Sequence, residues 1–139
     1  MKLAEKTKFD LDKKFQKVLK TPAGFDFFTA VHDFIGYIEL NSALSAGLSH
    51  RTKENRDSNI GTKYGYLKQI YQGLEDIKAS ERGDLGHERY SNIRDLSRIQ
   101  NNEVSENNFF WKKRELWRKL VVEVYERLGT HLSKSEKAE

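Results

Sequence analysis

The stretch NNFFWKKRELWRKLVVEVYERLGTHL, residues Asn107 to Leu132, decides the fold, because its apolar residues recur with the period of one long α-helix. At about 100° per residue, one side of this helix collects a continuous apolar stripe. The stripe consists of Phe110, Trp117, Leu120, Val121, Val124 and Leu128. Such a stripe is typical of a helix face buried in a bundle. The sequence therefore predicts a long amphipathic C-terminal helix packed against other helices.

The same helix carries a second apolar flank. Trp111, Val122 and Tyr125 lie on it, with Arg114 and Arg118 between this flank and the main stripe. Two interpretations stay open at this point. Either the flank packs inside the bundle while the cations reach outward along its edge, or it is an interface for a partner.

Apolar residues also repeat at helical spacing in the segments that precede this helix, and no segment alternates polar and apolar residues as a strand would. The helical segments are residues 9–19, 27–38, 64–77 and 90–99, with a weaker one at 44–48. We therefore predict an all-α protein. It should form a single compact bundle of five to six helices over residues 1–139, with frayed ends at 1–8 and 134–139.

Polar residues and the single proline predict where these helices begin. Thr21 followed by Pro22 resembles an N-cap with proline at the first helical position. The charged, Ser- and Asn-containing stretch 50–59 is predicted to be a loop. The further predicted N-caps are Ser42, and Ser105 or Asn107 for the last helix.

Three glycines lie inside predicted helices: Gly36, Gly47 and Gly73. Glycine in a helix interior costs up to about 1 kcal/mol relative to alanine. We therefore expect a bend or a close approach of another helix at these positions.

Composition narrows the class of protein. A chain of 139 residues can bury enough surface to fold as one domain, and the absence of cysteine excludes disulfides, thiolate metal sites and cysteine nucleophiles. No apolar run approaches the roughly 20 residues that cross a bilayer, and the first residues lack the apolar core of a secretory signal. We therefore expect a cytoplasmic protein that has no membrane partner.

The net charge of +4 conceals an uneven distribution. Residues 1–20 contain seven lysines and three acids, and residues 112–119 contain five cations and one acid, so each segment carries a local charge of +4. A local excess of positive charge attracts anionic partners.

The sequence contains no catalytic or cofactor-binding motif of useful specificity. His32, His50, His87 and His131 have no carboxylate at a metal-ligand spacing, and we interpret His32 as an ordinary surface histidine. The serines form no GxSxG elbow, and the glycines form no phosphate-binding loop. We therefore predict a non-catalytic protein that has neither a metal nor a cofactor.

The final helix supplies the predicted binding site. Its cations concentrate in the first half, where the helix dipole disfavours positive charge, so helix stability does not account for them. Lysine and arginine bind nucleic-acid phosphates, and an aromatic ring can stack on an unpaired base. We predict a small helical module that contacts the RNA or DNA backbone through Trp111, Lys112, Lys113, Arg114, Arg118 and Lys119.

Two alternatives remain. The first is a protein-interaction or oligomerisation module that buries Trp111, Val122 and Tyr125 across a contact. The second starts from Arg82-Gly-Asp-Leu-Gly-His87, which has the RxxxxH spacing of HEPN-type ribonucleases, a family that the chain also resembles in size and expected helical architecture. That resemblance implies a metal-independent ribonuclease, commonly dimeric, in which Arg82 stabilises the phosphate and His87 acts as an acid or base.

Overall fold

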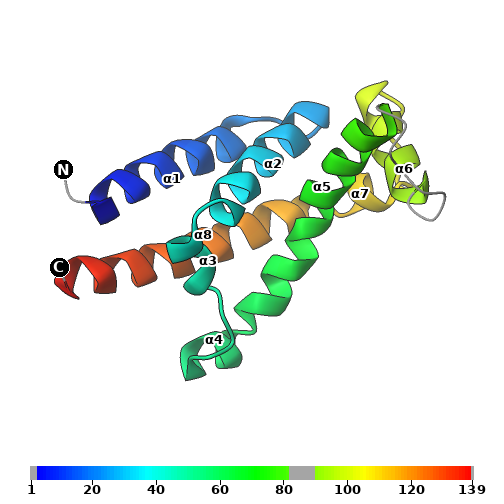
Figure 1. The fold of residues 1–139 in the computed structure, drawn as a ribbon. Helices are drawn as coiled ribbons and strands as arrows, with labels where there is room; N and C mark the ends of the chain where they lie inside the picture. Colours follow the sequence, from blue (N-terminus) through cyan, green and yellow to red (C-terminus); the bar gives the residue numbers. More distant parts are fainter. Residues whose placement is uncertain (1–2, 82–89, 139) are drawn as a thin grey trace.

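The computed structural model describes residues 3–81 and 90–138, and all the regular structure within them is helical (Figure 1). The described residues form α1 (Leu3–Lys20), α2 (Phe25–Glu39), α3 (Ser42–Ala46), α4 (Lys53–Ser58), α5 (Ile60–Glu81), α6 (Tyr90–Gln100), α7 (Phe109–Lys112) and α8 (Arg114–Ala138). The all-α prediction is confirmed. Two short helices, α4 and α7, were not expected as separate elements. Fraying of the two ends stays a prediction.

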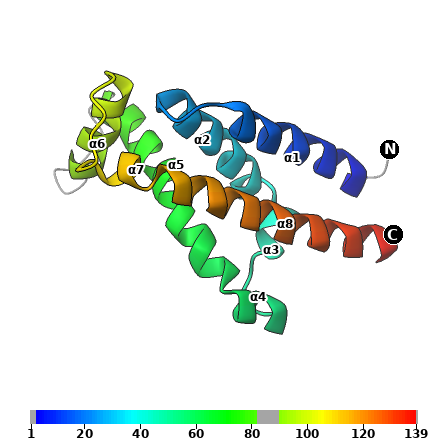
Figure 2. The same ribbon diagram turned by 180° about the vertical axis from the view of Figure 1, so that it is seen from behind.

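Four long helices make the body of the bundle. Helix α1 packs on α2 and α8, while α5 packs on α2 and α8 from the other side. Helices α1 and α8 run antiparallel, so the two ends of the described chain lie at the same end of the molecule (Figure 1). The reverse view shows α8 lying along α1 and crossing α5 (Figure 2). Helix α6 packs on α5 and α7.

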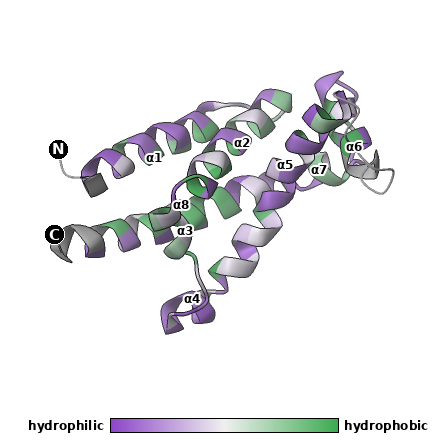
Figure 3. Ribbon diagram, viewed as in Figure 1, coloured by the Kyte–Doolittle hydropathy of each residue, from purple (hydrophilic) through white to green (hydrophobic). Residues whose placement is uncertain are grey.

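The predicted stripe of the final helix is the centre of the core. All six of its residues are buried, and the Trp117 indole N–H donates to the carbonyl of Phe110 at 2.8 Å. The stripe of α2 is buried against it, with the Phe28 and Phe110 rings 6.2 Å apart and nearly perpendicular. Apolar residues line the inner sides of the helices, whereas much of α1 is polar on its outer side (Figure 3).

The predicted start of α2 is wrong. The helix begins at Phe25, and the capping position is Gly24, whose φ of 148° suits glycine. The Thr21 hydroxyl donates to the carbonyl of Lys17 at 2.6 Å. Thr21 therefore extends the last turn of α1, and its side chain does not cap α2.

The caps of α3 and α7 are Asn41 and Asn108, and neither is a residue that we predicted as a cap. The side-chain oxygen of Asn41 accepts from the amides of Ala43 and Leu44 at 3.1 and 3.3 Å, so Ser42 is the first residue inside α3. The side-chain oxygen of Asn108 accepts from the amides of Phe110 and Trp111 at 3.0 and 3.1 Å. In both cases the cap lies one residue from a predicted one, and its carboxamide oxygen accepts from N–H groups of the first turn.

The stretch from 107 to 132 is not one continuous helix. Its first turn, α7, ends at Lys112, and the next residue, Lys113, has a φ of −103° and a ψ of 15° that depart from helical values. The buried Asn108 side chain also donates to the carbonyl of Asp95 at 2.7 Å, which ties α7 to α6. The cations expected in the first half of one helix are therefore distributed over α7, α8 and Lys113 between them.

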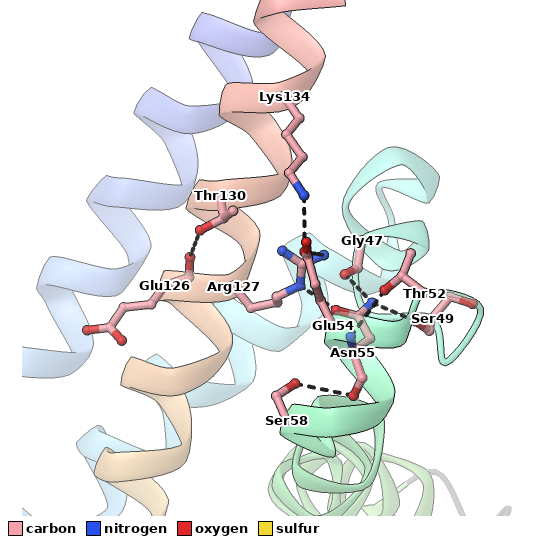
Figure 4. Close-up of polar contacts among 10 residues, drawn as sticks. All are labelled: Gly47, Ser49, Thr52, Glu54, Asn55, Ser58, Glu126, Arg127, Thr130 and Lys134. Carbon is pink, nitrogen blue, oxygen red and sulfur yellow. Dashed lines mark hydrogen bonds and ion pairs between the residues drawn. The ribbon is translucent and has the colours of Figure 1, made fainter.

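Residues 50–59, predicted to be a loop, contain α4. The Thr52 hydroxyl accepts from the amide of Asn55 at 3.1 Å and caps this helix. The Asn55 side chain is buried and donates to the carbonyls of Gly47 and Ser49. Its oxygen accepts from the Arg127 guanidinium, so one amide joins the turn after α3 to α8 (Figure 4).

A surface ion-pair cluster covers this amide. Glu54 lies 3.6 Å from Arg127 and 3.0 Å from Lys134 (Figure 4). The hydrogen bond and positive charge of Lys134 lower the pKa of the Glu54 carboxyl below its usual range. The cluster therefore helps to hold α4 against the last turns of α8.

Candidate functional site

The two basic segments of the sequence meet in the fold. The Arg118 guanidinium donates to the carbonyls of Val18, Leu19 and Thr21 at 3.2, 3.0 and 3.0 Å. These carbonyls belong to the C-terminal end of α1, where the helix dipole favours a cation. The basic end of α1 therefore adjoins the basic first half of α8, about 100 residues away along the chain.

Two carboxylates of α1 are hydrogen-bonded to neighbouring helices. Asp10 accepts from the Tyr37 hydroxyl of α2 at 3.4 Å, and Asp12 accepts from the Tyr125 hydroxyl of α8. Burial, together with the hydrogen bond and charge of Asp12, raises the pKa of Tyr125 to about 12, so this hydroxyl stays protonated and donates at neutral pH. These two acids therefore stand at the edges of the outer side of α1.

Lysines occupy that outer side. Lys13, Lys17 and Lys20 are exposed and recur at intervals of four and three residues, so they share one face of the helix. That face lies opposite the buried residues Leu11, Phe15 and Val18. Lys17 comes no closer than 3.9 Å to Asp33 in a loose, exposed ion pair.

The exposed lysine after Arg118 continues this charge onto α8. Lys119 follows the residue that contacts the end of α1, and Lys20 belongs to that same end. No described residue forms an ion pair with Lys20 or Lys119. We call the set Lys13, Lys17, Lys20 and Lys119 the α1–α8 basic face.

The structure does not bring the six predicted site residues onto one surface. Lys113 extends toward α5, with its ammonium 5.1 Å from the centre of the Tyr66 ring, and Arg118 is bound by α1. Arg114 lies 3.0 Å from Glu106 and stacks 4.5 Å from the centre of the Trp111 ring. Among the five cations of the predicted site, only Lys112 and Lys119 are exposed.

The second apolar flank packs against the core. Trp111, Val122 and Tyr125 are partly buried there. The Tyr125 ring stacks on Phe15 of α1, with the ring centres 3.8 Å apart and the planes within 5°. The interpretation in which this flank belongs to the bundle therefore has direct contacts in its favour, and its use as a partner interface stays a prediction.

His32 is not an ordinary surface histidine. Its Nε2 atom lies 2.6 Å from the Glu75 carboxylate, its ring stacks 4.7 Å from that of Tyr71, and its side chain is only 14% exposed. Sequence reasoning missed the pair because Glu75 comes 43 residues later, on α5. The pair joins α2 to α5 beside a hollow of about 330 Å³.

The described residues allow a search for metal-binding and membrane-spanning features, but they do not include the ribonuclease-like motif. Arg82 and His87 lie outside the described residues, so the ribonuclease motif stays a prediction. Among the residues that are described, no three histidine, aspartate or glutamate side chains gather closely enough to hold a metal ion. In the same part of the chain, no helix combines the length and the apolar character that crossing a membrane requires.

No protein-family model, curated protein or solved structure matches this chain.

Proposed function

We propose that this protein is a non-catalytic helical module that binds the phosphate backbone of RNA or DNA through the α1–α8 basic face. The observation that carries the proposal is the meeting of two segments, each with a local charge of +4, where Arg118 contacts the end of α1. Lysines displace condensed counterions when they bind phosphates, which favours association with a polyanion.

The spacing of the lysines suits an extended anionic chain. Lys13 and Lys20 are seven positions apart on α1, which corresponds to about 10 Å along the helix at 1.5 Å per residue. That length corresponds to roughly three nucleotides of one strand, at 3.4 Å of duplex axis per nucleotide. Lys119 adds a charge from the second helix, so a bound strand contacts both ends of the sequence at once.

The face is also preorganised. Arg118 fixes the end of α1, and the Tyr125–Asp12 hydrogen bond fixes its middle, so the lysine backbone positions are set before a partner arrives. A rigid surface loses less conformational entropy on binding than a mobile segment does. In this proposal Arg118 positions the face and does not contact the phosphates.

The test compares two double variants that each remove two positive charges. Lys20→Gln/Lys119→Gln alters the face, and Arg51→Gln/Lys53→Gln alters exposed cations at α4, on the far side of the molecule (Figure 1). Binding of a labelled single-stranded RNA is followed by fluorescence anisotropy at several salt concentrations. The face variant should bind more weakly, and the slope of log Kd against log salt should fall by about 1.4. An equal loss in the α4 variant, or no change in either, would contradict the proposal.

A further inference from the structure

One aromatic ring stands beside the lysines of α1 and has no role in the core. Phe9 is 53% exposed and lies one helical turn before Lys13. The Lys13 ammonium is 5.0 Å from the centre of the Phe9 ring. Core packing therefore does not explain why a phenylalanine occupies this position. Its ring lies at the surface next to a cation.

The ring and the lysines line one shallow hollow of about 610 Å³. Phe9 lies toward one end of it and Lys20 toward the other, with the exposed amide of Gln16 between them. Asp12 also lines the hollow, but its carboxylate accepts the hydrogen bond of Tyr125. The hollow thus combines an apolar ring, a neutral hydrogen-bonding amide and three cations along one helix.

We propose that this hollow binds a single strand of nucleic acid, with one unpaired base stacked on Phe9 and the adjoining phosphates on Lys13, Lys17 and Lys20. Gln16 is placed to hydrogen-bond the edge of the base or the sugar. The inference rests on the proposed function and adds to it the kind of nucleic acid that is recognised.

The choice of a single strand follows from the chemistry of the ring. An exposed aromatic side chain gains stacking energy only from a base whose face is open, and the bases of a duplex are already stacked on each other. Lysines alone would bind a duplex as well as a single strand. Phe9 therefore makes the single strand the preferred partner.

The test uses Phe9→Leu, which keeps an apolar side chain and all the charges but removes the aromatic face. The probes are a labelled ten-nucleotide adenine RNA and a blunt RNA duplex of equal length. Stacking contributes about 1 to 3 kcal/mol per base, so Phe9→Leu should weaken single-strand binding roughly 5- to 150-fold. Duplex binding and the salt slope should stay as in the wild type.

Leu40→Ala is the matched control, because Leu40 is 90% exposed and lies at the end of α2, away from the hollow. It should change neither affinity. If Phe9→Leu and the wild type bind the single strand with equal affinity, the stacking inference is overturned. The proposed function still stands in that case if Lys20→Gln/Lys119→Gln reduces the slope of log Kd against log salt. Binding to phosphatidylserine vesicles but to neither RNA overturns both.

Discussion

At the scale of single residues, Arg118 and Lys119 show how neighbours of like charge take different roles. The Arg118 guanidinium binds three carbonyls at the end of α1 and lies 4.8 Å from the centre of the Phe27 ring. Lys119 is exposed and has no ion pair with any described residue. A count of cations treats the two alike, whereas in the fold Arg118 is bound to the end of α1 and Lys119 is exposed.

This difference predicts opposite results for two substitutions. Arg118→Gln should lower the free energy of unfolding by about 1.5 to 3 kcal/mol, because charge-assisted hydrogen bonds to the end of α1 are lost. Lys119→Gln should change it by no more than about 0.5 kcal/mol, as expected for an exposed side chain. Urea denaturation followed by tryptophan fluorescence measures both. Equal stability of the two variants would show that the contact with α1 contributes nothing.

The sequence predicted individual residues well only where a periodic pattern supported them. All six residues of the main stripe are buried, since their positions follow directly from helical geometry. The caps were missed because several polar residues in a row can each cap a helix, and only the backbone conformation decides among them. The His32–Glu75 pair and the Asp12–Tyr125 pair were missed because tertiary contact brings those residues together.

At the scale of helices, α5 and α6 illustrate a close approach that the sequence anticipated. A Cβ atom added at Gly73 would lie 2.4 Å from a methyl carbon of Leu96, which is fully buried. The expectation that a neighbouring helix comes close at Gly73 is thus confirmed. The short helices α4 and α7 were not foreseen as separate elements, because a single turn depends on its cap and its contacts more than on an apolar stripe.

Two glycines of the same helix should therefore respond in opposite directions to alanine. Gly73→Ala should destabilise the protein by about 1 kcal/mol or more, since overpacking against Leu96 exceeds the gain in helix propensity. At Gly65 the added Cβ meets nothing within 4 Å, so Gly65→Ala should stabilise by up to about 1 kcal/mol. Thermal and urea unfolding of both variants provide the comparison. A shift of the same sign and size in both would mean that α6 does not press against Gly73.

At the scale of the whole molecule, the antiparallel pairing of α1 with α8 brings the basic end of α1 next to the basic first half of α8. The sequence revealed both clusters, but it did not reveal that they adjoin or which side chains turn inward. Lys113, Arg114 and Arg118 were expected to act together, and the break at Lys113 and the contact with α1 direct them elsewhere. The fold also exposes Lys13, Lys17 and Lys20 of α1, which were not among the predicted site residues.

The most direct test of this account is the salt dependence of single-stranded RNA binding by two single variants, Lys20→Gln on α1 and Lys119→Gln on α8. If both helices contact one bound strand, each variant should reduce the slope of log Kd against log salt by about 0.7, and the double variant by about twice as much. The wild type and Arg51→Gln/Lys53→Gln should share the full slope. A slope that responds to one helix alone, or to neither, would contradict the claim that α1 and α8 form one binding face.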